Sequence, residues 1–212
     1  MSVAKNTVAQ RSESQVLDTK FSTPPMIDRL EDRKMMSVVL PGGTVALHGT
    51  TEAARPELAG TVIRDTLVPL ELKVGSKVIF KGFMQDRVVR ETKTGTLDFY
   101  ECIRASSGFD DRVLVQSVAR TSFATVTTDV DYRTDGIGAT YLHPSSASRS
   151  ATRAIVDFKF SNTPIAPNED SQFFFIKTNA KQFVVEGKTT VTMATTSGQV
   201  ATETIVTADP LT

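Results

Sequence analysis

The stretch DSQFFFIKTNA, residues 170–180, carries four large apolar side chains in a row. Alternate residues of a β-strand point to opposite faces, so Phe173 and Phe175 share one face while Phe174 and Ile176 share the other. In a two-sheet sandwich only one face of each strand meets the core. We therefore expect the outward pair to be covered by the chain itself or by a second subunit, and we take Phe174 and Ile176 as candidate interface residues.

The same period-two pattern recurs along the chain. RAIVDFKF, residues 153–160, alternates apolar and polar side chains, and so do residues 76–83 and 96–106, which TKTG separates as in a hairpin. Turn signals recur every eight to twelve residues or so, which is typical of sandwiches and barrels built from about eight to ten strands. The sequence thus predicts an all-β fold, an antiparallel β-sandwich of jelly-roll type, with a barrel as the alternative.

Three segments leave more than one interpretation open. Residues 112–132 form either one long bent strand or two strands joined by a bulge near Arg120. Residues 181–207 suggest strand, turn, strand, turn and strand. Residues 133–151 form the clearest loop, because Asp-Gly is followed by a run of Ser and Ala. We expect this loop to carry contacts. The candidate ligand residues at the loop are Tyr132, Tyr141 and His143.

The N-terminal region differs from the rest. Residues 1–22 are polar and lack sustained periodicity, which predicts an extended arm. TPPMIDRLEDRKMM, residues 23–36, predicts one short helix, with Thr23 as its cap. Ile27 and Leu30 lie on one face of that helix, either against the sheet or as a docking surface for a partner. The predicted division is an arm with a helix at 1–36 and a sandwich domain at 37–212.

Composition narrows the function classes. Lys plus Arg and Asp plus Glu number 24 each, so the formal net charge is zero. Direct binding of nucleic acid is therefore not expected, because a basic stripe supplies most of that affinity. The same neutrality does not oppose association of copies. The N-terminus lacks the apolar stretch of a signal peptide, and no stretch is apolar enough for a membrane span. We expect synthesis in the cytoplasm and no membrane partner.

The chemistry-bearing residues do not form a recognisable site. His48, His143 and the single Cys102 stand apart, without metal-ligand spacing, although groups far apart in sequence can still converge in space. DVDYRTDG, residues 129–136, fails the calcium-loop pattern because Arg and Thr occupy its fifth and sixth positions. We expect no catalytic residue, no metal and no cofactor.

These observations favour a non-enzymatic structural subunit that self-associates in a larger assembly. A coat, decoration or tail protein of a viral or phage particle is the most natural setting for a cysteine-poor β-sandwich with an arm, so the mature location would be the virion. The alternative is a monomeric binding module that recognises a carbohydrate or small ligand through the 133–151 loop. A β-fold enzyme without a recognisable motif is the third hypothesis.

Overall fold

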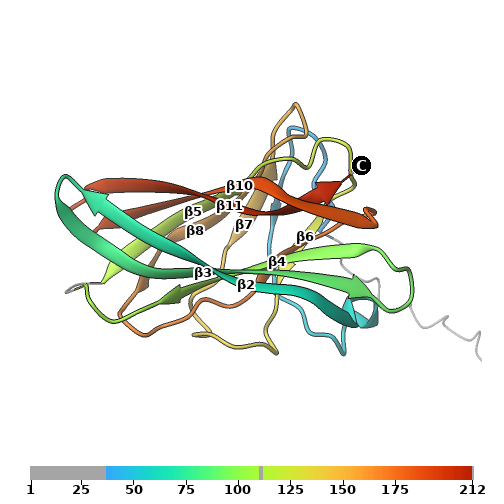
Figure 1. Ribbon diagram of the computed structural model, residues 1–212, viewed down its shortest axis with the longest axis horizontal. Coiled ribbons are helices and arrows are strands. Elements are labelled where there is room, and N and C mark those ends of the chain that lie inside the picture. The colour runs from blue at the N-terminus through green and yellow to red at the C-terminus, as the bar shows by residue number, and fades with distance from the viewer. Residues whose placement is uncertain (1–36, 110–111, 212) are drawn as a thin grey trace, which may run out of the picture. The chain divides into compact units, whose positions relative to one another are not determined.

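Eleven strands dominate the computed structural model, which describes residues 37–109 and 112–211 (Figure 1). All of these residues belong to one compact unit, Lys34–Thr212. The strands are β1 (Thr44–Ala46), β2 (Gly60–Val74), β3 (Lys77–Glu91), β4 (Leu97–Ala105), β5 (Val113–Arg120), β6 (Asp129–Tyr132), β7 (Ser146–Arg149), β8 (Val156–Ile165), β9 (Phe174–Lys177), β10 (Gln182–Thr195) and β11 (Val200–Leu211). One short 3-10 helix, η1 (Pro56–Leu58), precedes β2.

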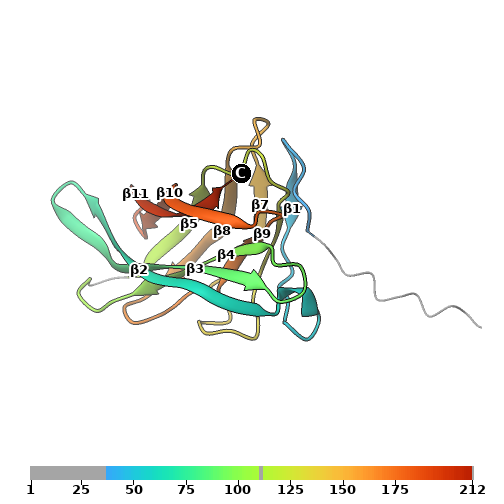
Figure 2. The ribbon, with the colours of Figure 1, turned by 45° about the vertical axis from the view of Figure 1, so that its right-hand side comes forward.

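Two antiparallel sheets pack face to face (Figure 2). The six-stranded sheet has the order β1-β7-β8-β5-β10-β11, and the five-stranded sheet has the order β2-β3-β4-β9-β6. The predicted all-β antiparallel sandwich is confirmed, and the barrel alternative is wrong because the strands form two separate sheets. The jelly-roll detail stays a prediction.

The core between the sheets follows from the predicted alternation. In β8, Val156, Phe158 and Phe160 are fully buried, and the polar residues between them face outward. Phe174 of β9 lies across the core, with its ring centroid 4.9 Å from that of Phe158 and 5.5 Å from that of Phe160. Burial of each such side chain contributes about 1.5–3 kcal/mol.

The two ambiguous strand segments are now resolved. Residues 112–132 hold two strands, β5 and β6, which lie in different sheets, so the chain crosses between sheets where a bulge near Arg120 was considered. Residues 182–211 hold two strands and one turn, not the three strands that the sequence suggested. The expected turn near Gly187 is a β-bulge, because Asp209 Oδ1 accepts hydrogen bonds from the amides of Glu186 and Gly187 and keeps the strand paired.

A segment before β1 closes one side of the sandwich. The Val39 amide donates to the Thr128 carbonyl, and the Val130 amide donates to the Ser37 carbonyl, so residues 37–39 lie along β6 before the chain enters the other sheet. The predicted short helix, with Ile27 and Leu30, lies outside the described residues. No helix within 37–109 and 112–211 is long and apolar enough to cross a membrane.

Candidate functional site

The candidate interface residues Phe174 and Ile176 do not lie on the surface. Their exposed fractions are 1% and 0%, and both belong to the core between the sheets. That interface prediction is wrong, because these two residues form the inward pair of the strand. The outward pair is Phe173 and Phe175.

The chain itself covers the outward pair. Phe173 and Phe175 are only 5% and 0% exposed, and they join a second apolar cluster with Leu58, Tyr100 and others. The Arg55 guanidinium lies 5.7 Å from the centroid of the Phe175 ring. Residues from the segment around η1 therefore cover the outward face that the sequence left unexplained, and this strand supplies no argument for a second subunit.

The predicted loop also packs on this face. Ala139 donates its amide to the Asp170 carbonyl, and Gly138 approaches residue 171 so closely that a Cβ atom would lie 2.1 Å from the Ser171 carbonyl oxygen. Gly138 has φ +109, a conformation that favours glycine. The loop is thereby held beside Phe173.

The three candidate ligand residues of the loop separate into two groups. The rings of Tyr132 and His143 stack on each other, with centroids 4.2 Å apart and an interplanar angle of 11°. The stack holds His143, within the loop, against Tyr132 at the start of the loop. Tyr141 is 44% exposed, and none of the three lines the pocket on the outer side of the five-stranded sheet.

Buried charges lie beneath the segment around η1. Arg55 donates to both carboxylate oxygens of Asp129, at 2.5 and 3.4 Å, and Lys177 forms an ion pair with Glu91. Asp98 lies in register with Lys177, yet its carboxyl oxygens accept no hydrogen bond from any described residue. Burial raises the pKa of the Asp98 carboxyl to about 8, although the charge of Arg55 opposes the shift. Asp98 is therefore mostly protonated at neutral pH.

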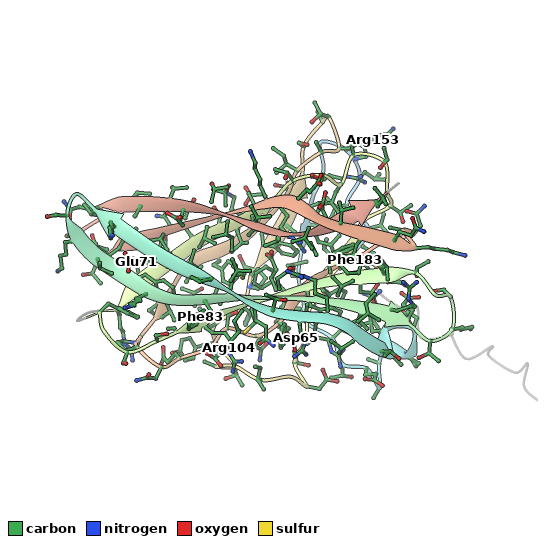
Figure 3. The ribbon with its side chains drawn as sticks, in the orientation of Figure 1. Asp65, Glu71, Phe83, Arg104, Arg153 and Phe183 are labelled. Carbon is green, nitrogen blue, oxygen red and sulfur yellow. The ribbon has the colours of Figure 1, made fainter. Side chains whose placement is uncertain are left out.

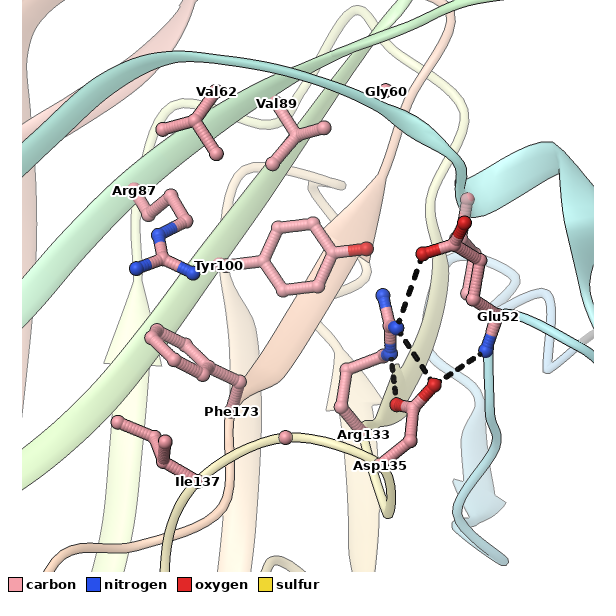
Figure 4. Close-up of a pocket in the computed structure, with 12 residues that line it drawn as sticks. Glu52, Gly60, Val62, Arg87, Val89, Tyr100, Arg133, Asp135, Ile137 and Phe173 are labelled. Carbon is pink, nitrogen blue, oxygen red and sulfur yellow. Dashed lines mark hydrogen bonds and ion pairs between the residues drawn. The ribbon is translucent and has the colours of Figure 1, made fainter.

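A pocket of about 470 Å³ opens on the outer side of the five-stranded sheet (Figure 4). The loop of residues 133–137 forms one wall, and the segment from Glu52 to the start of β2 forms another. Its apolar lining consists of Leu58, Val62, Val89, Tyr100, Ile137 and Phe173. Apolar walls with a few polar groups, at this volume, are typical of small-molecule sites.

Two arginines bring hydrogen-bond donors to the pocket. Arg133 pairs with Asp135 through Nε at 2.7 Å and Nη2 at 2.9 Å, and Arg87 pairs with Asp65 at 2.7 Å. The Tyr100 hydroxyl is buried, and Figure 4 shows the Arg133 guanidinium facing it, so no described residue accepts the hydroxyl hydrogen. Burial raises the pKa of Tyr100, so the phenol stays protonated.

A separate ionic cluster lies inside the sandwich. Arg120 is 1% exposed, and its Nε lies 3.1 Å from Glu101 Oε1. Its Nη2 donates to the Ala208 carbonyl, and Asp86 accepts from the Ala208 amide at 3.0 Å. This cluster connects β3, β4 and β5 with β11, but it is closed to solvent, so it has a structural role.

The thiol of the single cysteine is not a reactive nucleophile. Cys102 is fully buried, and burial raises the pKa of its thiol to about 12. Among the residues that the structure describes, no three His, Cys, Asp or Glu side chains lie close enough to hold a metal ion.

The outer face of the six-stranded sheet is built differently. The strand register places short side chains in two rows that cross all six strands. We call these two rows the small-residue face: Thr44, Ser148, Asp157, Ala119, Thr190 and Thr204 in one, and Ala46, Ser146, Lys159, Ser117, Thr192 and Thr202 in the other. All twelve are exposed or half-buried, and the two charged members, Asp157 and Lys159, pair with each other at 2.6 Å.

Part of the pocket was accessible to sequence reasoning. The loop predicted to carry contacts supplies Arg133, Asp135 and Ile137. Arg87 and Tyr100 were missed, because strands β3 and β4 bring them to the loop only in the folded chain. The one available signal was the outward parity of Tyr100 in the predicted strand.

The chain resembles nothing to which it was compared: no protein-family model, no curated protein and no solved structure matches it. Its function must therefore be argued from its own residues.

Proposed function

We propose that this chain is a non-enzymatic structural subunit that self-associates in a larger assembly, with copies meeting through the small-residue face. The finer form of the proposal is a viral or phage particle protein, of the coat, decoration or tail type. That finer form rests on the use of β-sandwich subunits in such particles, which is an argument by fold analogy.

The observation that carries the proposal is the absence of unpaired charge across two rows of the small-residue face. Ser, Thr and Ala lose little side-chain entropy on burial, whereas the long charged residues usual on an exposed sheet lose more. Charged residues are also depleted at the centres of interfaces.

An apolar row extends the same face. Pro164, Leu114, Ala194 and Val200 are directly opposite one another on β8, β5, β10 and β11. Val200 is 56% exposed, and Val206 on the same strand is 52% exposed. Ala194 itself is buried, but Pro164, Leu114, Val200 and Val206 add apolar area to a face whose other contacts would be polar. The zero net charge of the chain does not oppose close approach of copies.

Sedimentation velocity of the full chain tests the proposal. The wild type should sediment as an oligomer, and Thr192→Arg, which places a long cation in the small-residue face, should shift it to the monomer. Thr61→Arg introduces the same change at an exposed position of β2 and should leave the mass unchanged. A wild type that stays monomeric at all concentrations would refute self-association.

Electron microscopy tests the finer form. Closed shells or tubes would support a particle protein. Small discrete oligomers would refute the coat form of the proposal while leaving self-association intact.

The pocket favours a second candidate function, a monomeric binding module for a carbohydrate or small ligand. Tyr100 and Phe173 are buried at 4% and 5% exposure, so neither offers the flat open platform on which sugars stack. A small ligand therefore suits the pocket better than a carbohydrate.

A further inference from the structure

We infer that the pocket on the five-stranded sheet binds a small aromatic carboxylate, with the carboxylate at the Arg133–Tyr100 end and the ring near Phe173 and Val62. This inference rests on the second candidate function and does not require self-association. Four features of the pocket support it.

The first feature is a buried hydroxyl whose hydrogen has no acceptor. Tyr100 lines the pocket, and its hydroxyl faces the Arg133 guanidinium, which can only donate, so no described residue accepts the hydroxyl hydrogen. A buried polar group that lacks a partner costs about 1–3 kcal/mol. An acceptor brought by a ligand would remove that cost.

The second feature is the orientation of Arg133. Asp135 engages Nε and Nη2 of its guanidinium, and the Glu52 amide donates to the same Asp135 carboxylate at 2.8 Å. This chain of contacts fixes the guanidinium and leaves Nη1 facing the Tyr100 hydroxyl (Figure 4). Nη1 and the hydroxyl are two donors on one side, which suits the two oxygens of a carboxylate.

The third feature is the local charge. Asp135 and Glu52 lie 2.7 and 3.7 Å from Arg133, and Arg87 adds a second guanidinium to the lining, so the charged groups that line the pocket balance one another. Recognition therefore depends on the direction of the hydrogen bonds. A compact aromatic carboxylate that places its oxygens at both donors fits this arrangement.

The fourth feature is the apolar end of the pocket. The Arg87 guanidinium lies 4.5 Å from the Phe173 ring centroid, and Val62, Val89 and Ile137 complete the wall. Ring edges and aliphatic groups favour a flat ring in offset contact. The volume of about 470 Å³ leaves room for a single substituted ring.

Calorimetric titration of the full chain with benzoate tests the inference, with benzamide as the neutral probe of the same shape. We expect saturable benzoate binding and benzamide binding about tenfold weaker, because hydrogen bonds to a charged acceptor are roughly twice as strong as neutral ones. No saturable benzoate binding, or equal binding of both probes, would overturn the inference.

Two matched arginines locate the site. Arg87 and Arg104 both lie on the outer face of the five-stranded sheet, and each pairs with an aspartate, at 2.7 and 2.8 Å. Only Arg87 lines the pocket. Arg87→Gln and Ile137→Glu should weaken benzoate binding, whereas Arg104→Gln should not. An equal loss in both arginine variants would contradict this location.

The two proposals can fail separately. Benzoate binding is read from heat and self-association from sedimentation, so a chain that binds benzoate as a monomer would refute the assembly proposal alone. An oligomer that does not bind benzoate would refute the ligand inference alone.

Discussion

The outer faces of the two sheets differ in their side chains and in how far they are exposed. On the five-stranded sheet, Phe173 and Phe175 point outward and are almost completely buried by loops and by Arg55 and Arg87. On the six-stranded sheet, the small-residue face stays exposed or half-buried. Figure 3 shows Phe83, Arg104 and Asp65 on the outer side of the five-stranded sheet. A face with aromatic residues needs covering by its own chain, whereas a face of short polar residues tolerates water and leaves room for a partner.

The largest expected effect is a difference in the free energy of unfolding between variants on the two outer faces. Phe175→Ala should lower the free energy of unfolding by about 3–5 kcal/mol, because it leaves a cavity beneath the cover. Thr190→Ala on the small-residue face should change it by only about 0.5 kcal/mol. Urea denaturation measures both. Similar losses in the two variants would mean that the small-residue face is as tightly packed as the covered one.

A smaller effect depends on pH. The pKa of Asp98 is about 8 in the folded chain and close to 4 in an unfolded one. The folded chain keeps this proton while the unfolded chain loses it, so the contribution to stability falls as pH rises from about 4 to about 8, by roughly 1.4 kcal/mol per unit of pKa shift.

Asp98→Asn should remove that dependence. The variant should gain on the wild type by a few kcal/mol in unfolding free energy between about pH 5 and pH 8.5. Urea denaturation at both pH values measures the difference, so any constant cost of the amide cancels. A difference that does not change with pH would show that Asp98 is not held in its protonated form.

The smallest effect concerns the pocket. Tyr100→Phe removes a buried hydroxyl whose hydrogen has no acceptor, so it should raise stability by about 1 kcal/mol while weakening benzoate binding about tenfold. Thermal unfolding and calorimetry measure the two quantities on the same sample. A variant that loses stability and keeps its affinity would show that the hydroxyl serves the fold rather than a ligand.

Local sequence patterns were enough to predict the β-sandwich. They were not enough to predict which apolar residues face its core and which are covered on its outer side. The alternation in 153–160 and 96–106 determines which side chains meet the core, and this is why the all-β class and the β3–β4 hairpin could be predicted. The four apolar residues at 173–176 gave the right face pairs but not which pair is inward. That choice depends on Phe158 and Phe160, which lie on another sheet.

The candidate site was harder to predict, because it depends on contacts between residues far apart in the chain. The 133–151 loop could be predicted from its composition, but its packing on Phe173 depends on the close approach of Gly138 to residue 171. The pairing of Arg55 with Asp129 joins residues far apart in the chain, and charge alternation along either segment does not reveal it. The small-residue face likewise emerges only from the register of six strands.

Cysteine reactivity tests the central claim, that copies meet through the small-residue face. The single native Cys102 is buried with a raised pKa, so a new cysteine reports alone. The alkylation rate of Thr192→Cys should fall as protein concentration rises, while that of Thr61→Cys should stay constant. A Thr192→Cys rate that does not change with concentration would contradict the claim.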